Sequence, residues 1–471
     1  MKNLLTIALP LLTIFIFLDC AKQEPFDNAN VMQINNVGLR RDVFVRRYKM
    51  TSAYGQQKSF TPAVLREFIA TVLEPDYLLI QNAYDKGMHK DPDIQQKMRD
   101  YKINTLANSH PIKSKVLEIS SAQLHEFYQK KSFLYDVDLV LTNSWMMTEE
   151  THRHIIAGGK IEPPREGREF TFPRLQQYRD LTFGQMTIHP AVLERMEKMQ
   201  PGEVSDPIYN SGMWTIIALQ RKRANRALQP LHTMEKTLLA ELQGLLRYRQ
   251  QIQLLDELKK KYGVEIHSEY YPAIISAHVS RENRGWIDKT KLDDADLQQT
   301  LIRVGDEAIT VENFITDLNL ALQNVQSRQI ADKDIQHFAD DYANQYLLYL
   351  DVVHNDFLLD ELVVDRLVNK EHRLLLSHYL KTEIADRVVI SDDDAREYYQ
   401  KTTDRWQASF DKVSNSVKGE LRNQRLQEKR QEIVDALRKK YAVRYNDALL
   451  SDLAEQLTAE KSAQAQTEPR I

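Results

Sequence analysis

The chain contains an internal repeat, and one copy of the repeat carries a long segment that the other lacks. Residues 116–130 (VLEISSAQLHEFYQK) are echoed by residues 387–401 (RVVISDDDAREYYQK), and residues 257–264 (ELKKKYGV) by residues 436–443 (ALRKKYAV). The spacing from Tyr128 to Tyr262 is 134 positions, whereas that from Tyr399 to Tyr441 is 42, a difference of 92. This pattern predicts a helical module used twice, with a small domain inserted into its first copy.

Composition places the chain among ordinary water-exposed globular proteins. Its 471 residues are enough for about three domains, and 28% are charged and 8% aromatic. The net charge is −4, with both signs interspersed, which argues against a nucleic-acid-binding protein. Glycine is scarce, at 14 residues, and long stretches have helical periodicity. We therefore expect a mainly α protein with a small α+β insert.

The amino-terminal segment has the features of a secretion signal. Lys2 precedes an apolar run from Leu4 to Leu18, which is too short for a spanning helix of about 20 residues. The single cysteine of the chain, Cys20, follows and resembles the lipidated cysteine of a bacterial lipoprotein, although Asp19 replaces the usual small residue. The alternatives are an ordinary cleaved signal or an uncleaved short anchor. Residue 21 is alanine, not the aspartate that retains many lipoproteins at the inner membrane, so we expect a periplasmic location at the outer membrane. With no second cysteine, no disulfide framework is expected.

Turn and capping residues divide the rest of the chain. Ser120 or Ser121, Ser391 and Thr310 are predicted to cap the amino-terminal ends of helices, and the aspartates at 392–394 favour the dipole of the helix after Ser391. The predicted divisions are a signal peptide (1–20), a tether (21–33), the first helical module (34–132), the insert (133–223), the closing long helix of that module (224–267), a connector (268–295), the second module without an insert (296–450), and a carboxy-terminal tail expected to be disordered (451–471).

The insert differs in character from the helical modules around it. We expect strands at 137–141 and 214–219, and helices at 148–156 and 191–199, which end at Gly158 and before Pro201 respectively. A proline-rich loop separates the two halves. This order of elements predicts a separate α+β domain.

Two stretches of the insert resemble a known family. Residues 200–208 (QPGEVSDPI), followed by residues 212–219 (GMWTIIAL), resemble the closing half of a parvulin-type peptidyl-prolyl isomerase domain. The flanking helical modules resemble those of SurA/PrsA/PpiD-type extracytoplasmic foldases, in which helical segments enclose a parvulin domain. The resemblance implies a SurA-like helical chaperone module whose first copy carries a parvulin-like domain, and it implies no cofactor.

The residues that would carry isomerase chemistry depart from the family pattern. The two histidine positions fall on Leu139 and Thr215, and two positions that wall the prolyl pocket fall on Val192 and Glu197. We expect Leu139 and Thr215 to lie opposite each other on neighbouring strands, about 5 Å apart. A pocket with an apolar side at Leu139 and a carboxylate at Glu197 is poorly suited to stabilising a twisting prolyl amide, whose barrier is about 20 kcal/mol. We therefore expect a degenerate parvulin fold, weak or inactive as an isomerase.

Other residue patterns favour structural roles. His152 and His154 lie two positions apart on a predicted helix and so face different directions, which favours a surface pair over a metal site. The aspartates at 392–394 lack the spacing of a calcium loop, and no nucleophile or phosphate-binding motif is present. We expect neither a metal nor a cofactor.

Three functions remain open from the sequence. The leading hypothesis is a cell-envelope chaperone, anchored by lipid, that binds unfolded secreted or outer-membrane polypeptides without ATP. The second is an active parvulin-type isomerase, which Leu139, Thr215 and Glu197 oppose. The third is a structural lipoprotein that scaffolds an envelope assembly.

Overall fold

The computed structural model describes residues 26–467, apart from 58, 162–171, 211, 282–283, 323–329, 356 and 358–359. The signal peptide, Cys20 and most of the tether therefore lie outside the described residues. The expected fold class is confirmed in its general form, because the chain is mainly helical with small sheets. No helix in the described part is long and apolar enough to span a membrane.

The chain forms two compact units, one from residues up to Arg99 together with those from Val364 onward, and the other from Asp100–Val363. The chain passes between them within α5 (Pro92–Asn108) and within α14 (Glu361–Tyr379). The other elements of the first unit are β1 (Asn30–Ile34), β2 (Val37–Arg40), α1 (Arg41–Lys49), α2 (Ser52–Gln56), α3 (Pro62–Phe68), η1 (Ile69–Leu73), α4 (Glu74–Asp85), η2 (Met88–Lys90), η6 (Leu380–Ile384), η7 (Ala385–Arg387), α15 (Asp392–Lys401), η8 (Thr403–Arg405), α16 (Phe410–Lys440), β12 (Val443–Tyr445) and α17 (Asp447–Thr467).

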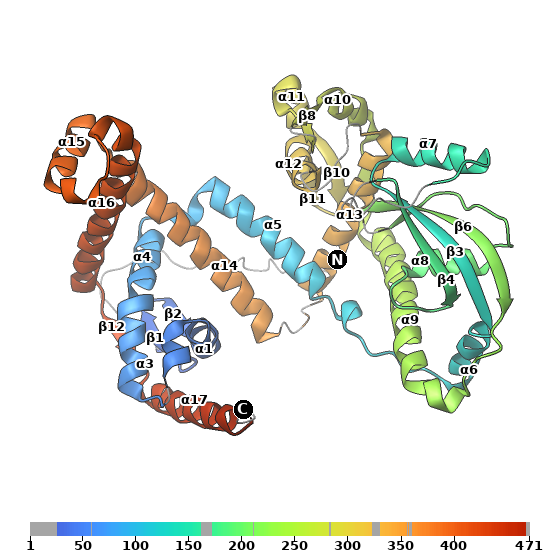
Figure 1. Cartoon of the computed structure of the whole chain (residues 1–471), viewed down its shortest axis with the longest axis horizontal. Coiled ribbons are helices and arrows are strands. Elements are labelled where there is room, and N and C mark those ends of the chain that lie inside the picture. The colour runs from blue at the N-terminus through green and yellow to red at the C-terminus, as the bar shows by residue number, and fades with distance from the viewer. Residues whose placement is uncertain are drawn as a thin grey trace, which may run out of the picture. The chain divides into compact units, whose positions relative to one another are not determined.

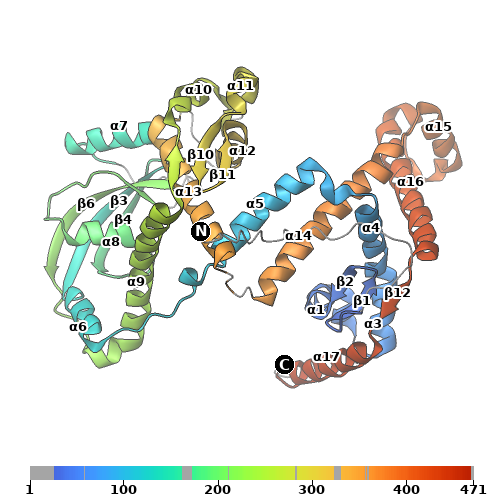
Figure 2. The same ribbon diagram turned by 180° about the vertical axis from the view of Figure 1, so that it is seen from behind.

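The first unit is built around a three-stranded sheet of order β12-β1-β2. Every residue of β1 is buried, because α4 and the carboxy-terminal helices pack around this sheet in one apolar core. Figure 1 shows β12, near the carboxy-terminal end of the colour range, beside the blue β1 and β2, and Figure 2 shows the same arrangement from behind. The two ends of the described chain therefore complete one core.

The carboxy-terminal residues belong to that core. Disorder was expected from residue 451 onward, but α17 continues to Thr467, and Leu453 and Leu457 are fully buried. Their spacing of four residues places both side chains on one helix face, and that face packs on the first unit. The polar composition of the segment reflects its exposed face, so the expectation of a disordered tail is corrected for residues 451–467.

A buried histidine makes the stability of the first unit depend on pH. The ring of His372, on α14, meets the ring of Tyr77 edge to face at 5.8 Å between centroids. Burial, and then the charge of Arg47, lowers its pKa to about 4. In the unfolded chain the imidazole titrates near 6.5, so below that pH the unfolded state binds a proton that the folded state does not. Stability from the neutral ring is therefore present above about pH 6.5 and is lost as the pH falls toward 4.

We expect His372→Phe, which keeps a ring but cannot be protonated, to remove this dependence. Between about pH 7 and about pH 4.5, the wild-type chain should lose about 2 kcal/mol more unfolding free energy than the variant, as measured by urea unfolding. Burial and Asp42 raise the pKa of Asp365 to about 6, which gives the opposite slope, but this carboxyl is present in both proteins and cancels in the difference. Equal losses in the two proteins would contradict the assignment.

The second unit contains two small sheets, a hairpin and long helices. Its elements are η3 (Pro111–Lys113), α6 (Ser121–Lys130), β3 (Phe133–Thr142), α7 (Trp145–Ile156), β4 (Arg174–Thr182), α8 (Pro190–Glu197), β5 (Ile208–Asn210), β6 (Met213–Ala224), α9 (Leu231–Tyr262), β7 (Val264–Ile266), η4 (Ser268–Tyr270), α10 (Tyr271–Ser276), β8 (His278–Arg281), β9 (Arg284–Ile287), η5 (Lys289–Lys291), α11 (Asp294–Leu297), β10 (Thr300–Val304), β11 (Glu307–Thr310), α12 (Val311–Leu322) and α13 (Asp332–His354).

The insert forms a four-stranded antiparallel sheet of order β4-β3-β6-β5, in the α+β arrangement expected from its sequence. One face of this sheet packs against α6, α8 and α9 in an apolar core. A second core joins α10, α12 and α13 to the sheet β11-β10-β7 and includes Tyr271, Ile274 and Ile287. The segment 268–295, expected to be a connector, therefore contributes to a core.

The closing strands are exchanged relative to the predicted modules. Strand β7 follows α9 but pairs with β10, and β12 follows α16 but pairs with β1. The registers correspond, since Val264 lies opposite Val304 and Val443 lies opposite Ile34. The end of each closing helix enters the core beside the sheet that its strand completes. The hairpin β1–β2 is thus closed by the helix and strand of 410–445, whereas α6, in the same predicted module, packs against α9.

The predicted helix caps are confirmed. Ser120 and Ser391 each form a capping box, in which the serine side chain accepts from the backbone of the third helical residue and that residue's side chain accepts from the serine backbone. The Thr310 hydroxyl accepts from the Asn313 backbone N–H at 3.2 Å. These contacts involve neighbours in sequence, so the sequence alone was sufficient to predict them.

Candidate functional site

The residues at the isomerase positions lie on the closed face of the insert sheet. Leu139 on β3 is opposite Ile217 on β6, and Thr215 is opposite Leu141. Leu139 and Thr215 are therefore on neighbouring strands, as expected, but two residues apart along them and not directly opposed. The two positions are offset along the strands because the match to the family's paired isoleucines identifies Thr215 in the sequence but does not determine which residue of β3 lies opposite it.

The residues at these positions on this face are buried. Leu139 is 4% exposed and Thr215 is 1% exposed, and Val192 on α8 is in the same apolar core as Leu139. The Thr215 hydroxyl accepts from the Asn210 amide at 2.9 Å. Glu197, expected to acidify a pocket here, instead pairs with the Lys130 ammonium at 2.8 Å. Among the described residues, a leucine and a threonine therefore stand at the two positions where the resemblance places histidines, and both are buried.

A buried ion pair fastens the closed face to α9. The Lys131 ammonium lies 2.5 Å from the Glu241 carboxylate, with side chains only 2% and 9% exposed. Burial lowers the pKa of Lys131 and raises that of Glu241, while the ion pair opposes both changes. Lys131 also donates to the Thr182 hydroxyl at the end of β4, at 3.4 Å. The pair therefore links the α6–β3 junction, β4 and α9.

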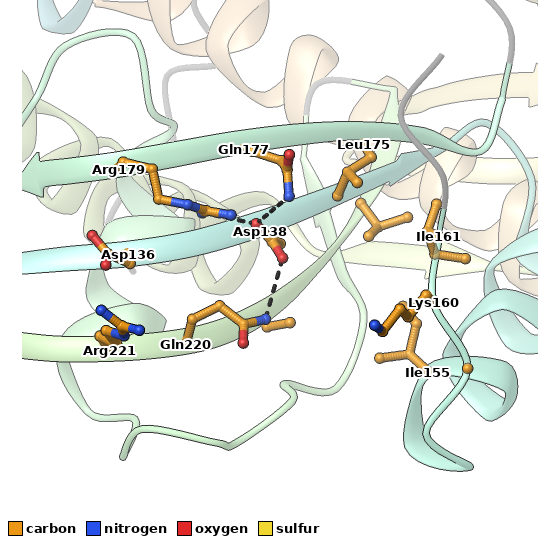
Figure 3. A pocket seen from close by; sticks show the side chains of 13 residues that line it. Asp136, Asp138, Ile155, Lys160, Ile161, Leu175, Gln177, Arg179, Gln220 and Arg221 are labelled. Carbon is orange, nitrogen blue, oxygen red and sulfur yellow. Dashed lines mark hydrogen bonds and ion pairs between the residues drawn. The ribbon is translucent and has the colours of Figure 1, made fainter. Parts of the chain in front are cut away.

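The opposite face of the sheet is open and hollowed, as Figure 3 shows. We call this hollow the sheet groove; its volume is about 590 Å³. Strands β3, β4 and β6 form its floor, and the end of α7 with the residues after it forms one wall. Its lining residues are Asp136, Asp138, Val140, Ile155, Gly159, Lys160, Ile161, Leu175, Gln177, Arg179, Ala218, Gln220 and Arg221.

Asp138 organises the polar part of the sheet groove. One carboxylate oxygen accepts from Arg179 at 2.9 Å and from Gln177 at 3.2 Å, and the other accepts from Gln220 at 3.2 Å. These three bonds come from the two strands on either side of β3 (Figure 3). Because each glutamine donates through its nitrogen, each keeps a carbonyl oxygen available as an acceptor.

The groove changes character along its length. The end near α7 is apolar, with Val140, Ile155, Ile161 and Leu175, whereas the other end carries amides and charges of both signs. A groove that combines aliphatic side chains with fixed amides matches a polypeptide, which presents apolar side chains and backbone amides together. Its lining residues include no serine, threonine or cysteine.

The sheet groove was not predicted from the sequence. The available signal was the alternation along β3, where Asp136, Asp138 and Val140 interleave with the buried Val137 and Leu139. Alternation of this kind indicates that the Leu139 face is covered, but not that a neighbouring helix turns the other face into a groove.

The remaining predicted residues take structural positions. His154 lies on α7 with its ring nitrogen 3.3 Å from the Lys160 carbonyl. No group of three or more metal-binding side chains occurs in the described part of the chain. Asp392 pairs with Lys418, and Asp394 pairs with Arg425. Both aspartates lie at the amino-terminal end of α15, which agrees with the predicted capping turn.

Comparison with known proteins adds little to this description. No protein-family model and no curated protein matches the chain. Among solved structures, the chain is similar to the crystal structure of PrsA from Bacillus subtilis, at 14% sequence identity and a TM-score of 0.16, over 48% of this chain and 88% of that chain. A TM-score this low carries no argument about fold or activity.

Proposed function

We propose that this protein is an ATP-independent chaperone of the cell envelope that binds unfolded secreted or outer-membrane polypeptides. The sheet groove carries the proposal, because it offers aliphatic contacts and organised amides on one open surface. Such a surface binds extended chains through features that all polypeptides share.

We further propose that the insert is a degenerate parvulin-like domain retained for binding. The motif at 200–208 and the order β3-α7-β4-α8-β5-β6 support this assignment. Against residual isomerase activity stand Leu139 and Thr215, which are buried at the positions where the resemblance places histidines. The duplicated helical modules, and the lipid anchor at Cys20 that would hold the protein at the outer membrane, also remain proposals; they rest on the sequence patterns.

The test is dilution of a chemically unfolded protein into buffer that contains the full-length chain, with aggregation followed by light scattering. We expect the chain to delay aggregation, and Ile155→Asp to reduce the delay at least about twofold, because it places a charge at the apolar end of the groove. Ile156→Asp is the matched control: its side chain is 63% exposed on the same helix and does not line the groove. A proline-isomerisation assay on the same samples should stay at the uncatalysed rate.

Three results would count against the proposal. If Ile155→Asp protects as well as the wild-type chain, the groove is not the binding surface. If the chain accelerates proline isomerisation, the isomerase reading is restored. A chain with neither activity would favour the scaffold.

A further inference from the structure

A second hollow in the second unit lies where the insert meets α12 and α13. We call it the aromatic pocket; it is formed mainly by Tyr209, Trp214 and Phe338 with Leu318, Leu322 and Ile330. Its volume is about 180 Å³. This is well below the roughly 300–1,000 Å³ of typical small-molecule sites, and it suits one large side chain.

The aromatic wall is held firmly in place. The ring of His337 stacks on Tyr209 at 4.4 Å and meets Trp214 edge to face at 4.7 Å. Asp334, at the amino-terminal end of α13, accepts from the Trp214 indole N–H at 3.1 Å and from the Trp145 backbone N–H at 2.8 Å. It also accepts from the Ala331 backbone N–H, so its two oxygens are already occupied. The aromatic wall is therefore preformed, and the Asp334 carboxylate already serves to hold it in place.

Asn143 also lines the aromatic pocket, but its polar atoms, unlike those of Asp334, are not already bonded to described residues. Both polar atoms of its carboxamide are withdrawn from solvent and have no hydrogen-bond partner among the residues that the structure describes. An amide that is buried without hydrogen bonds destabilises the fold, and such amides are rare in native proteins. A carboxamide has one donor group and one acceptor, the same pattern as a peptide bond, so it pairs with a backbone whatever the sequence.

We propose that the aromatic pocket binds an extended stretch of client polypeptide through one large aliphatic side chain, while the Asn143 carboxamide pairs with the adjoining backbone. This inference rests on the proposed function and names the client chemistry. Leucine is the residue class that fits, because the pocket is small, lined by aromatic and aliphatic groups, and its carboxylate is already engaged. The proposal requires the carboxamide to turn toward the occupant.

The probe is a blocked ten-residue peptide of alanine, serine and glycine with one central leucine, titrated into the full-length chain and followed by isothermal titration calorimetry. Replacing the leucine by alanine should weaken binding about tenfold or more. Asn143→Leu should weaken it about tenfold while leaving the melting temperature of the free chain unchanged or higher, since an unpaired buried amide is removed. A purely structural role for Asn143 predicts a lower melting temperature and unchanged affinity.

A second variant tests the pocket without touching Asn143. Ala321→Trp should fill the aromatic pocket and abolish peptide binding, whereas Leu320→Trp, at a neighbouring position that is 58% exposed and outside the pocket, should not. Equal binding by the leucine and alanine peptides would overturn the proposal. So would binding of N-acetyl-leucinamide as tightly as the peptide, which would indicate a small-molecule site.

The two proposals can fail separately. If the chain suppresses aggregation but Asn143→Leu and Ala321→Trp bind the peptide normally, the aromatic pocket is excluded and the chaperone function stands. If the chain binds the peptide through this pocket but does not delay aggregation, the proposed function fails and the pocket assignment stands.

Discussion

Replacing Lys131 by methionine is expected to destabilise the second unit by about 3 kcal/mol or more, because the Glu241 carboxylate is left buried without its partner. The double variant Lys131→Met/Glu241→Met should recover most of that loss, since apolar residues of similar volume need no compensation. The measurement is urea unfolding at neutral pH, followed by circular dichroism. Lys130→Met is the matched control, because the neighbouring pair with Glu197 is partly exposed, at 24% and 29%, and should contribute at most about 1 kcal/mol.

The pH dependence of Lys131→Met provides a check on the cause. Burial already raises the pKa of Glu241 in the wild-type chain, and loss of the ammonium should raise it further. A carboxyl with a raised folded-state pKa favours the fold when protonated, so the variant should regain stability as the pH falls through that pKa. A variant whose deficit does not shrink toward acid pH would indicate lost packing and not an uncompensated charge.

Replacing Leu453 by alanine is expected to destabilise the first unit by about 2–5 kcal/mol, the usual cost of emptying a fully buried leucine site. The reason is that α17 completes the core around β1, although its sequence is polar. Glu455→Ala, on the exposed face of the same helix, should change stability by no more than about 0.5 kcal/mol. Hydrogen exchange of the β1 amides reads the effect within this unit, and equal protection in the two variants would show that α17 does not support the core.

Local features of the fold could be predicted from the sequence because they depend on neighbours in the chain. Ser120, Ser391 and Thr310 cap helices through side chains and N–H groups no more than three residues away. In the insert, periodicity and glycine and proline breaks predicted β3, α7, α8 and β6, whereas β4 and β5 were not predicted.

The order of the carboxy-terminal helix and the presence of the sheet groove depend on contacts between distant segments of the chain. Leu453 and Leu457 form a narrow apolar stripe on a polar helix, and such a stripe is ordered only when a partner surface is present. The alternation on β3 places aspartates on one face and Val137 and Leu139 on the other, which already favours a covered Leu139 face. It does not show that the end of α7 lies beside the Asp138 face and makes it a groove, because that contact joins separate elements.

The sequence by itself determined that this chain uses the same helix-and-strand ending twice, because residues 257–264 and 436–443 share one pattern. That same likeness left their pairing undecided, since Val264 and Val443 are equally suited to either hairpin. Only the tertiary structure decided that β7 pairs with β10 and β12 with β1. The physical reason is that strand pairing is a long-range contact, chosen by which cores the preceding helices α9 and α16 fill.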